Sequence, residues 1–229
     1  MVRIKDLFDL EKTMARSYLE GFEYPWQALK GIGAMILELG RSLGSDYEKR
    51  GENVWVHRTA MVFDSAYLGP VCIVGPKTEV RHGAFVRGNA LIGENCVIGN
   101  SVELKNVIIF DCCQVPHFNY VGDSILGFHA HMGAGAITSN VRADRGNVVV
   151  HAVGEDGKEI ETGLRKVGAM LGDFAEVGCN AVLNPGTVVG RNTQIYPLAC
   201  VRGVVPEGCI YKTGGVIVKK IDDKGLGLL

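Results

Sequence analysis

The sequence predicts a mainly β protein, built as a parallel β-helix of hexapeptide repeats, and two regularities predict it. Through residues 56–109 an aliphatic residue recurs every six positions, and a second, mostly small residue follows each one after four more. A period of six fits neither an α-helix nor a strand, and three such hexads make one triangular coil. The aliphatic positions are Val56, Val62, Leu68, Val74, Val80, Val86, Ile92, Ile98 and Leu104. The second positions are Ala60, Ala66, Cys72, Thr78, Ala84, Ala90, Cys96, Val102 and Ile108.

Composition agrees with this fold and excludes some partners. The 31 glycines and 7% aromatic residues fit a solenoid that turns at every corner. A net charge of −1 and a pI of about 6.6 give no basic surface for nucleic acid. We find no signal peptide and no apolar run long enough to span a membrane. Seven cysteines without CxxC spacing, with Cys72 and Cys96 at inward positions, indicate free thiols and a reducing, cytoplasmic location.

Residues 1–52 are expected to form an N-terminal helical cap. Apolar residues in 4–20 have helical spacing up to Gly21, and a second helix follows with Pro25 in its first turn and Gly44 as C-cap. Its apolar residues from Trp26 to Leu43 form one stripe. A helical pair lying on a membrane is the alternative. Because the polar faces mix acidic and basic residues, we favour a unit that covers the open end of the solenoid.

The β-helix is expected to span residues 53–208, with about six coils. From Phe110 the repeat is irregular: Gln114 falls at a position meant for a small apolar residue, and Val121 to Leu126 is a step of five. An insertion at 138–166 reads as a protruding β-hairpin, with strands at 147–153 and 158–162 and a turn at 155–157. The repeat resumes at Leu171, and residues 209–229 form an extended tail.

Two cations lie one coil apart. Arg87 and Lys105 each follow an inward aliphatic residue and are 18 residues apart, so they stack on one outer face about 4.8 Å apart. Their repulsion of roughly 1–3 kcal/mol would be relieved by a shared anion, such as a sugar phosphate. Two other interpretations stay open at this point: solvated side chains that splay apart, or pairing of Arg87 with Glu103.

His117 follows Pro116 in the irregular coil, with Tyr120 close behind. A neutral histidine is a suitable base for removing a proton from an attacking amine. The alternative is a structural histidine, which is the commoner role for a lone one. Metal binding is not favoured, because His129 and His131 lack a cysteine or carboxylate at zinc-like spacing.

A resemblance to a known family rests on two motifs. Residues 116–140 read PHFNYVGDSILGFHAHMGAGAITSN, and residues 164–169 read LRKVGA. With these motifs, residues 53–218 resemble the acetyltransferase domain of the bifunctional glucosamine-1-phosphate acetyltransferase / N-acetylglucosamine-1-phosphate uridyltransferase, and most of all its archaeal sugar-1-phosphate relatives. The family's nucleotidyltransferase domain has no counterpart in this sequence. The resemblance implies a left-handed helix, a homotrimer, and acetyl-CoA and an amino-sugar phosphate meeting between subunits without a metal.

The resemblance also implies roles for individual residues. His117 matches the catalytic base, and Asn140 matches the asparagine that orients the amino sugar and the developing oxyanion. Ala134 falls at a backbone contact to the CoA thioester. The phosphate-binding cations correspond to Arg87 and Lys105.

Tyr120 corresponds to a tyrosine that contacts the sugar phosphate. Two positions depart from the family pattern. His131 replaces a substrate-binding asparagine, and Gly146 stands where a lysine is expected. Arg142 and Arg145 are candidate replacements for that lysine.

We therefore expect an acetyl-CoA-dependent N-acetyltransferase acting on an amino-sugar 1-phosphate similar to glucosamine-1-phosphate. One alternative is a non-catalytic sugar-phosphate-binding or partner subunit related to UDP-N-acetylglucosamine pyrophosphorylase. Another is an O-acyltransferase using the same base. Binding of acetyl-CoA separates enzyme from binding module, and amine versus hydroxyl acceptors separate the two transfers.

Overall fold

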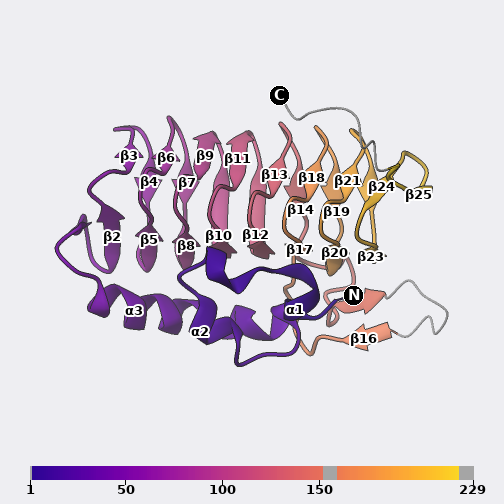
Figure 1. The fold of residues 1–229 in the computed structure, drawn as a ribbon, viewed down its shortest axis with the longest axis horizontal. Helices are drawn as coiled ribbons and strands as arrows, with labels where there is room; N and C mark the ends of the chain where they lie inside the picture. Colours follow the sequence, from indigo (N-terminus) through magenta and orange to yellow (C-terminus); the bar gives the residue numbers. More distant parts are fainter. Residues whose placement is uncertain (1, 152–158, 222–229) are drawn as a thin grey trace.

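A computed structural model describes residues 2–151 and 159–221. Short parallel strands wind into coils that stack along one axis, as Figure 1 shows from indigo to yellow. This is the left-handed hexapeptide β-helix that the sequence and its resemblance predict. The coils have three faces, which we call faces 1, 2 and 3 in chain order.

The strands of the three faces have the following bounds. Face 1 holds β2 (Val54–His57), β5 (Cys72–Val74), β8 (Ala90–Ile92), the second half of β10 (Glu103–Ile109), the second half of β12 (Tyr120–Leu126), β17 (Ala169–Leu171), β20 (Thr187–Val189) and β23 (Val204–Val205). Face 2 holds β3 (Met61–Val62), β6 (Glu79–Val80), β9 (Val97–Asn100), β11 (Gln114–His117), β13 (His131–Met132), β18 (Glu176–Val177), β21 (Gln194–Ile195) and β24 (Cys209–Tyr211). Face 3 holds β4 (Tyr67–Leu68), β7 (Phe85–Val86), the first halves of β10 and β12, β14 (Ile137–Thr138), β19 (Val182–Leu183) and β22 (Cys200–Val201).

Seven coils are complete in the described residues, against about six predicted, because each of the seven face 3 strands closes one coil. β23 and β24 begin an eighth. At the first coil β1 (Tyr47–Lys49) pairs antiparallel with β2, and at the last β25 (Ile217–Lys219) pairs antiparallel with β24. Antiparallel strands therefore protect both ends of the stack from edge pairing.

The interior is filled as the repeat predicts. Val74, Ile92 and Leu104 are fully buried, as are the second positions Cys72 and Ala90. Burial raises the pKa of the Cys72 thiol to about 12, so this side chain is a neutral apolar filler.

The predictions for Ile108 and Gln114 are wrong: Val107 pairs with Ala90 and takes the inward position, so Ile108 points outward with Leu91. Ile109 pairs with Ile92, 17 residues earlier, so one residue has been lost from the coil between them. The shift places Cys113 at the inward position, fully buried, and turns Gln114 outward. The corner absorbs the missing residue without disturbing the parallel pairing.

The N-terminal segment does not cover the end of the solenoid, and that part of the prediction is wrong. Its helical elements are α1 (Ile4–Leu7), η1 (Leu10–Lys12), α2 (Arg16–Leu19), η2 (Pro25–Gly31) and α3 (Ile32–Ser42), so the first predicted helix is broken into short turns. They run lengthwise beneath the coils in Figure 1, with α3 against β5, β8 and β10 and η2 against β12. The approach is close: a Cβ at Gly40 would lie 2.5 Å from the Trp55 ring.

The reason is that face 1 is apolar on both sides. The outward residues at the centre of its strands, Ile73, Leu91, Ile108, Ile125 and Met170, are as buried as the inward ones. Covering each such side chain stabilises the fold by about 1.5–3 kcal/mol, so the apolar column favours a helical cover along the side.

The insertion forms the predicted hairpin. β15 (Val149–His151) pairs antiparallel with β16 (Glu159–Glu161), and the predicted turn at 155–157 lies outside the described residues. At its base Val148 and Val150 are buried against Gly186, which adopts a positive φ of 79°. The hairpin extends from the C-terminal half of the solenoid in Figure 1. In the described residues no helix is both long and apolar enough to cross a membrane.

Candidate functional site

The corner between faces 3 and 1 carries a column of outward residues, one from each of the second to seventh coils. Lys105 pairs in register with Gly122, and the ladder of backbone hydrogen bonds continues on both sides. We call this set the corner column: Arg87, Lys105, Gly122, Ser139, Asn184 and Arg202. Arg87 and Lys105 lie on consecutive coils, as their spacing predicts.

Both cations have carboxylate partners. Arg87 Nη1 lies 2.9 Å from Glu103 Oε1, so of the open interpretations this pairing is the one observed. The Arg87 side chain is 48% exposed, and such surface pairs contribute at most about 1 kcal/mol. The ammonium of Lys105 donates to both oxygens of Asp123, at 2.9 and 3.0 Å. An incoming phosphate would displace Glu103 easily and would share Lys105 with Asp123.

Asp123 is the centre of the site, and the sequence interpretation missed it. Its carboxylate is buried and also accepts from the amides of Asn106 at 2.9 Å and Asn140 at 2.6 Å. Asp123 follows Lys105 by 18 residues, but the coil between them is one residue short, so Gly122 is in register with Lys105 and Asp123 lies one position further along. A regular coil length therefore did not identify it. A buried carboxylate with three donors fixes the positions of all three.

Tyr120 and Asn140 are joined through this carboxylate. The amide of Asn140 also donates to the Tyr120 hydroxyl at 3.2 Å. Burial raises the pKa of Tyr120, and the charge of Asp123 raises it further, so the phenol stays protonated and able to donate. Gly122 is required here, because a Cβ would lie 2.4 Å from the Tyr120 hydroxyl.

His117 ends β11 at the corner between faces 2 and 3, three residues before Tyr120. Its backbone is held from both sides: the N–H donates to Asn119 Oδ1 at 3.1 Å, and the C=O accepts from Gly135 at 3.0 Å. Asn119 is buried and donates in turn to the carbonyls of Gly133 and Ala136. The imidazole is exposed and has no hydrogen-bond partner among the described residues. A fixed backbone with a free ring suits a base that must reach a bound amine.

His131 and Ala134 lie on the next coil beside this corner. His131 Nδ1 lies 2.7 Å from Glu176 Oε2, and both side chains line a groove of about 410 Å³ on face 2 together with Gly133. The N–H of Ala134 has no acceptor within the described part of the chain. The groove therefore runs up to a free backbone donor close to His117.

Arg142 and Arg145 do not join this group. The guanidinium of Arg142 is taken up by Asp144, at 3.0 Å through Nε, and by the carbonyl of Asn147. Arg145 is exposed, and its side chain makes no hydrogen bond or ion pair in the described structure. Their role as replacements for the family lysine stays a prediction. The described residues also contain no cluster of three or more His, Cys, Asp or Glu side chains arranged to hold a metal ion.

Comparisons with known proteins agree with this description. The family model for the GMPPB C-terminal domain matches residues 71–160. The chain is 38% identical over 112 residues to the bifunctional sugar-1-phosphate nucleotidylyltransferase/acetyltransferase of Sulfurisphaera tokodaii, covering 49% of this chain and 27% of that protein. It is 33% identical over 156 residues to the bifunctional protein GlmU of Methanococcus vannielii, covering 68% and 34%. The chain thus spans about a third of the length of these relatives.

Solved structures include more distant neighbours. A hexapeptide transferase family protein from Anaplasma phagocytophilum matches with a TM-score of 0.44 and 16% identity, covering 76% of this chain and 82% of that one. The acetyltransferase domain of PglB from Neisseria gonorrhoeae, in complex with acetyl coenzyme A, matches with a TM-score of 0.33 and 18% identity, covering 73% and 57%.

The chain is thus a homologue of the C-terminal region of archaeal-type sugar-1-phosphate nucleotidylyltransferase/acetyltransferases. The resemblance predicted from the motifs is confirmed. The 229 residues do not include the nucleotidyltransferase part of those proteins.

Proposed function

We propose that the protein is an acetyl-CoA-dependent N-acetyltransferase acting on an amino-sugar 1-phosphate similar to glucosamine-1-phosphate. The observation that carries the proposal is the Lys105–Asp123–Asn140–Tyr120 network, together with the free ring of His117 three residues before Tyr120. The network combines a cation for phosphate with neutral donors for a sugar, and His117 supplies a base.

The reaction follows from the groups available. The amine nitrogen of the acceptor forms a bond to the thioester carbonyl carbon, and the neutral imidazole of His117 takes the proton that this nitrogen loses. The N–H of Ala134 is a donor for the oxyanion that develops. When the C–S bond breaks, the imidazolium returns the proton to the sulfur, and CoA leaves as the thiol. Holding both substrates in one cleft supplies much of the rate by proximity.

Acetyl-CoA is placed in the face 2 groove by this proposal. The groove passes His131, Glu176 and Cys179 and ends near Ala134. No metal is needed, because proton transfer and oxyanion stabilisation use protein groups alone.

We also propose a homotrimer in the cytoplasm, with subunits meeting at face 3. The outward residues in register with Tyr120 include exposed apolar side chains, Tyr67 by 56%, Phe85 by 43% and Ile137 by 37%, with Glu103 between Phe85 and Tyr120. Exposed apolar side chains aligned on one face favour burial against another subunit. Such an interface would enclose the acceptor site.

One observation favours the second candidate, a binding or partner subunit without catalysis. Both predicted phosphate cations are paired with carboxylates of this chain, which weakens their attraction for phosphate. The replacement of the family asparagine by His131 also favours the non-catalytic subunit. An O-acyltransferase remains an outcome of the test below.

An acceptor screen that measures CoA release tests the proposal. Glucosamine-1-phosphate and galactosamine-1-phosphate should release CoA from acetyl-CoA, and glucose-1-phosphate, which offers only hydroxyls, should not. Release with glucose-1-phosphate would identify O-acyl transfer. Tight binding of acetyl-CoA without release for any acceptor would favour the non-catalytic subunit.

A further inference from the structure

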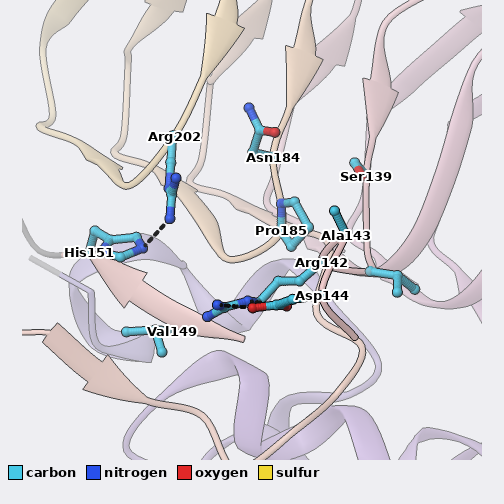
Figure 2. A pocket seen from close by; sticks show the side chains of 10 residues that line it. Ser139, Arg142, Ala143, Asp144, Val149, His151, Asn184, Pro185 and Arg202 are labelled. Atoms are coloured by element: carbon cyan, nitrogen blue, oxygen red, sulfur yellow. Dashed lines mark hydrogen bonds and ion pairs between the residues drawn. The ribbon is translucent and has the colours of Figure 1, made fainter. Parts of the chain in front are cut away.

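A cavity of about 520 Å³ lies between the insertion and the last coils, away from His117 (Figure 2). Its polar lining comes from three places: the stretch before the hairpin, the hairpin itself, and the corner column. The polar lining residues are Ser139, Arg142, Asp144, His151, Asn184 and Arg202. Val141, Val149 and Pro185 supply apolar walls.

The positive charge of Arg202, in the wall of this cavity, is not paired with a carboxylate in the described structure. No carboxylate within the described residues pairs with it, and its one side-chain partner is His151, whose Nε2 lies 3.0 Å from Nη2. Arg142, by contrast, forms an ion pair with Asp144 on the same wall, as the dashed lines in Figure 2 show. The remaining N–H groups of Arg202 are free to bind an acceptor.

The guanidinium is nonetheless held in a defined direction. A guanidinium only donates, so Nε2 of His151 must accept, and the proton of the neutral ring must be on Nδ1. Nδ1 lies 2.7 Å from Glu159 Oε1, which accepts that proton. The chain from Glu159 through His151 to Arg202 therefore orients the arginine in advance of any ligand.

Further polar groups lie on adjacent positions of the corner column. The hydroxyl of Ser139 has no partner among the described residues. The amide of Asn184 donates to the carbonyl of Val201 at 2.9 Å, which fixes the side chain beside Arg202. An arginine fork with a neighbouring hydroxyl is an arrangement that suits phosphate.

We propose that this cavity is a second oxyanion-binding site, for the phosphate group of a small polar molecule, anchored by Arg202. Four coils separate Arg202 from Lys105 along the corner column, or about 19 Å at the spacing of adjacent strands. One sugar phosphate cannot reach both cations. The phosphate thus belongs either to the far end of a larger acceptor or to a separate metabolite.

The test measures phosphate binding directly, so it does not depend on the proposed acetyl transfer. Inorganic phosphate is titrated by calorimetry into Lys105→Ala protein, in which the other candidate phosphate site is weakened. Adding Arg202→Gln should weaken the binding of phosphate about tenfold or more, which is the usual contribution of one charge-assisted hydrogen bond. The matched control is Arg41→Gln, which removes an exposed cation from α3 at the N-terminal end of the solenoid and should leave binding unchanged.

Equal phosphate affinity in the Arg202→Gln and Arg41→Gln proteins, both with unchanged melting temperature, would overturn the proposal. Arg202 would then only hold the hairpin in place through His151. Where the site is present, kinetics identify the source of the phosphate. A raised KM for the acceptor in Arg202→Gln assigns it to the acceptor. An unchanged KM together with lost phosphate binding assigns it to a separate metabolite.

Discussion

At the scale of single residues, the site depends on one carboxylate with two opposed effects. Asp123 fixes Lys105 and Asn140, and its negative charge also offsets the cation that a phosphate would need. A residue that only stabilised the fold would not separate these effects. Substrate affinity and turnover should therefore respond differently to its replacement.

Asp123→Asn should lower kcat about tenfold to a hundredfold, because Asn140 loses a charge-assisted hydrogen bond that orients it. KM for the sugar phosphate should stay level or fall, since Lys105 becomes an uncompensated cation. Steady-state kinetics check both values. Glu103→Gln is the matched control: it frees Arg87 without touching Asn140, so kcat should stay unchanged. A rise in KM for Asp123→Asn with normal kcat would contradict this role.

His117→Ala should lower kcat by about 10²–10⁴-fold, the usual contribution of a general base, with KM little changed. Gln114→Ala, an exposed position on the same strand, serves as the control and should retain full activity. Wild-type turnover in His117→Ala would remove the proposed mechanism and leave the binding subunit as the better description.

The residues of the site could be predicted only in part. Spacing of 18 found Arg87 and Lys105, because one coil has a fixed length. Glu103 was considered as a partner of Arg87, but Asp123 was not considered for Lys105, because the shortened coil shifts Asp123 out of the regular register. The cavity at Arg202 could not be predicted, because the insertion that forms its other wall interrupts the repeat.

At the scale of elements, the N-terminal segment and face 1 form one unit. The repeat predicted the inward residues of face 1 but said nothing of the residues between them. Ile73 and Leu91 are apolar on successive coils, and this second column was the signal that the helices cover the side. The end of the stack needs only β1, since an edge strand can be protected by one antiparallel partner.

Leu91→Ala should therefore lower the free energy of unfolding by about 2–4 kcal/mol, although Leu91 points away from the interior of the coils. Urea denaturation checks this value. Val97→Ala is the control, because Val97 lies outward on face 2 without a helix over it, and its loss should be below about 1 kcal/mol.

Deletion of residues 1–46 extends the same argument. It should expose the whole outward column of face 1 and cause dye binding and aggregation. A deleted protein that stayed soluble, with no exposed apolar surface, would show that the helices are not needed to cover face 1.

At the scale of the whole molecule, the three faces differ in what covers them. Face 1 has the N-terminal segment, and face 2 presents mainly polar or charged outward residues such as Glu79, Gln114 and Gln194. Face 3 presents Tyr67 and Phe85 in contact, with ring centroids 5.6 Å apart, and no helix over them in the described structure. Face 3 is thus the surface where a partner copy would bury the most apolar area.

The last prediction tests that surface. Wild-type protein should have the mass of a trimer by light scattering at micromolar concentration. Phe85→Glu should shift it toward the monomer, because a charge buried in an apolar contact costs more free energy than one side chain contributes to association. Met61→Glu, at an apolar residue of face 2 that is more exposed than Phe85, is the control and should remain trimeric. Acetyl transfer should fall with the trimer fraction if the cleft is shared between subunits. A monomeric wild-type protein, or a Phe85→Glu monomer with full activity, would mean that one chain carries the complete site.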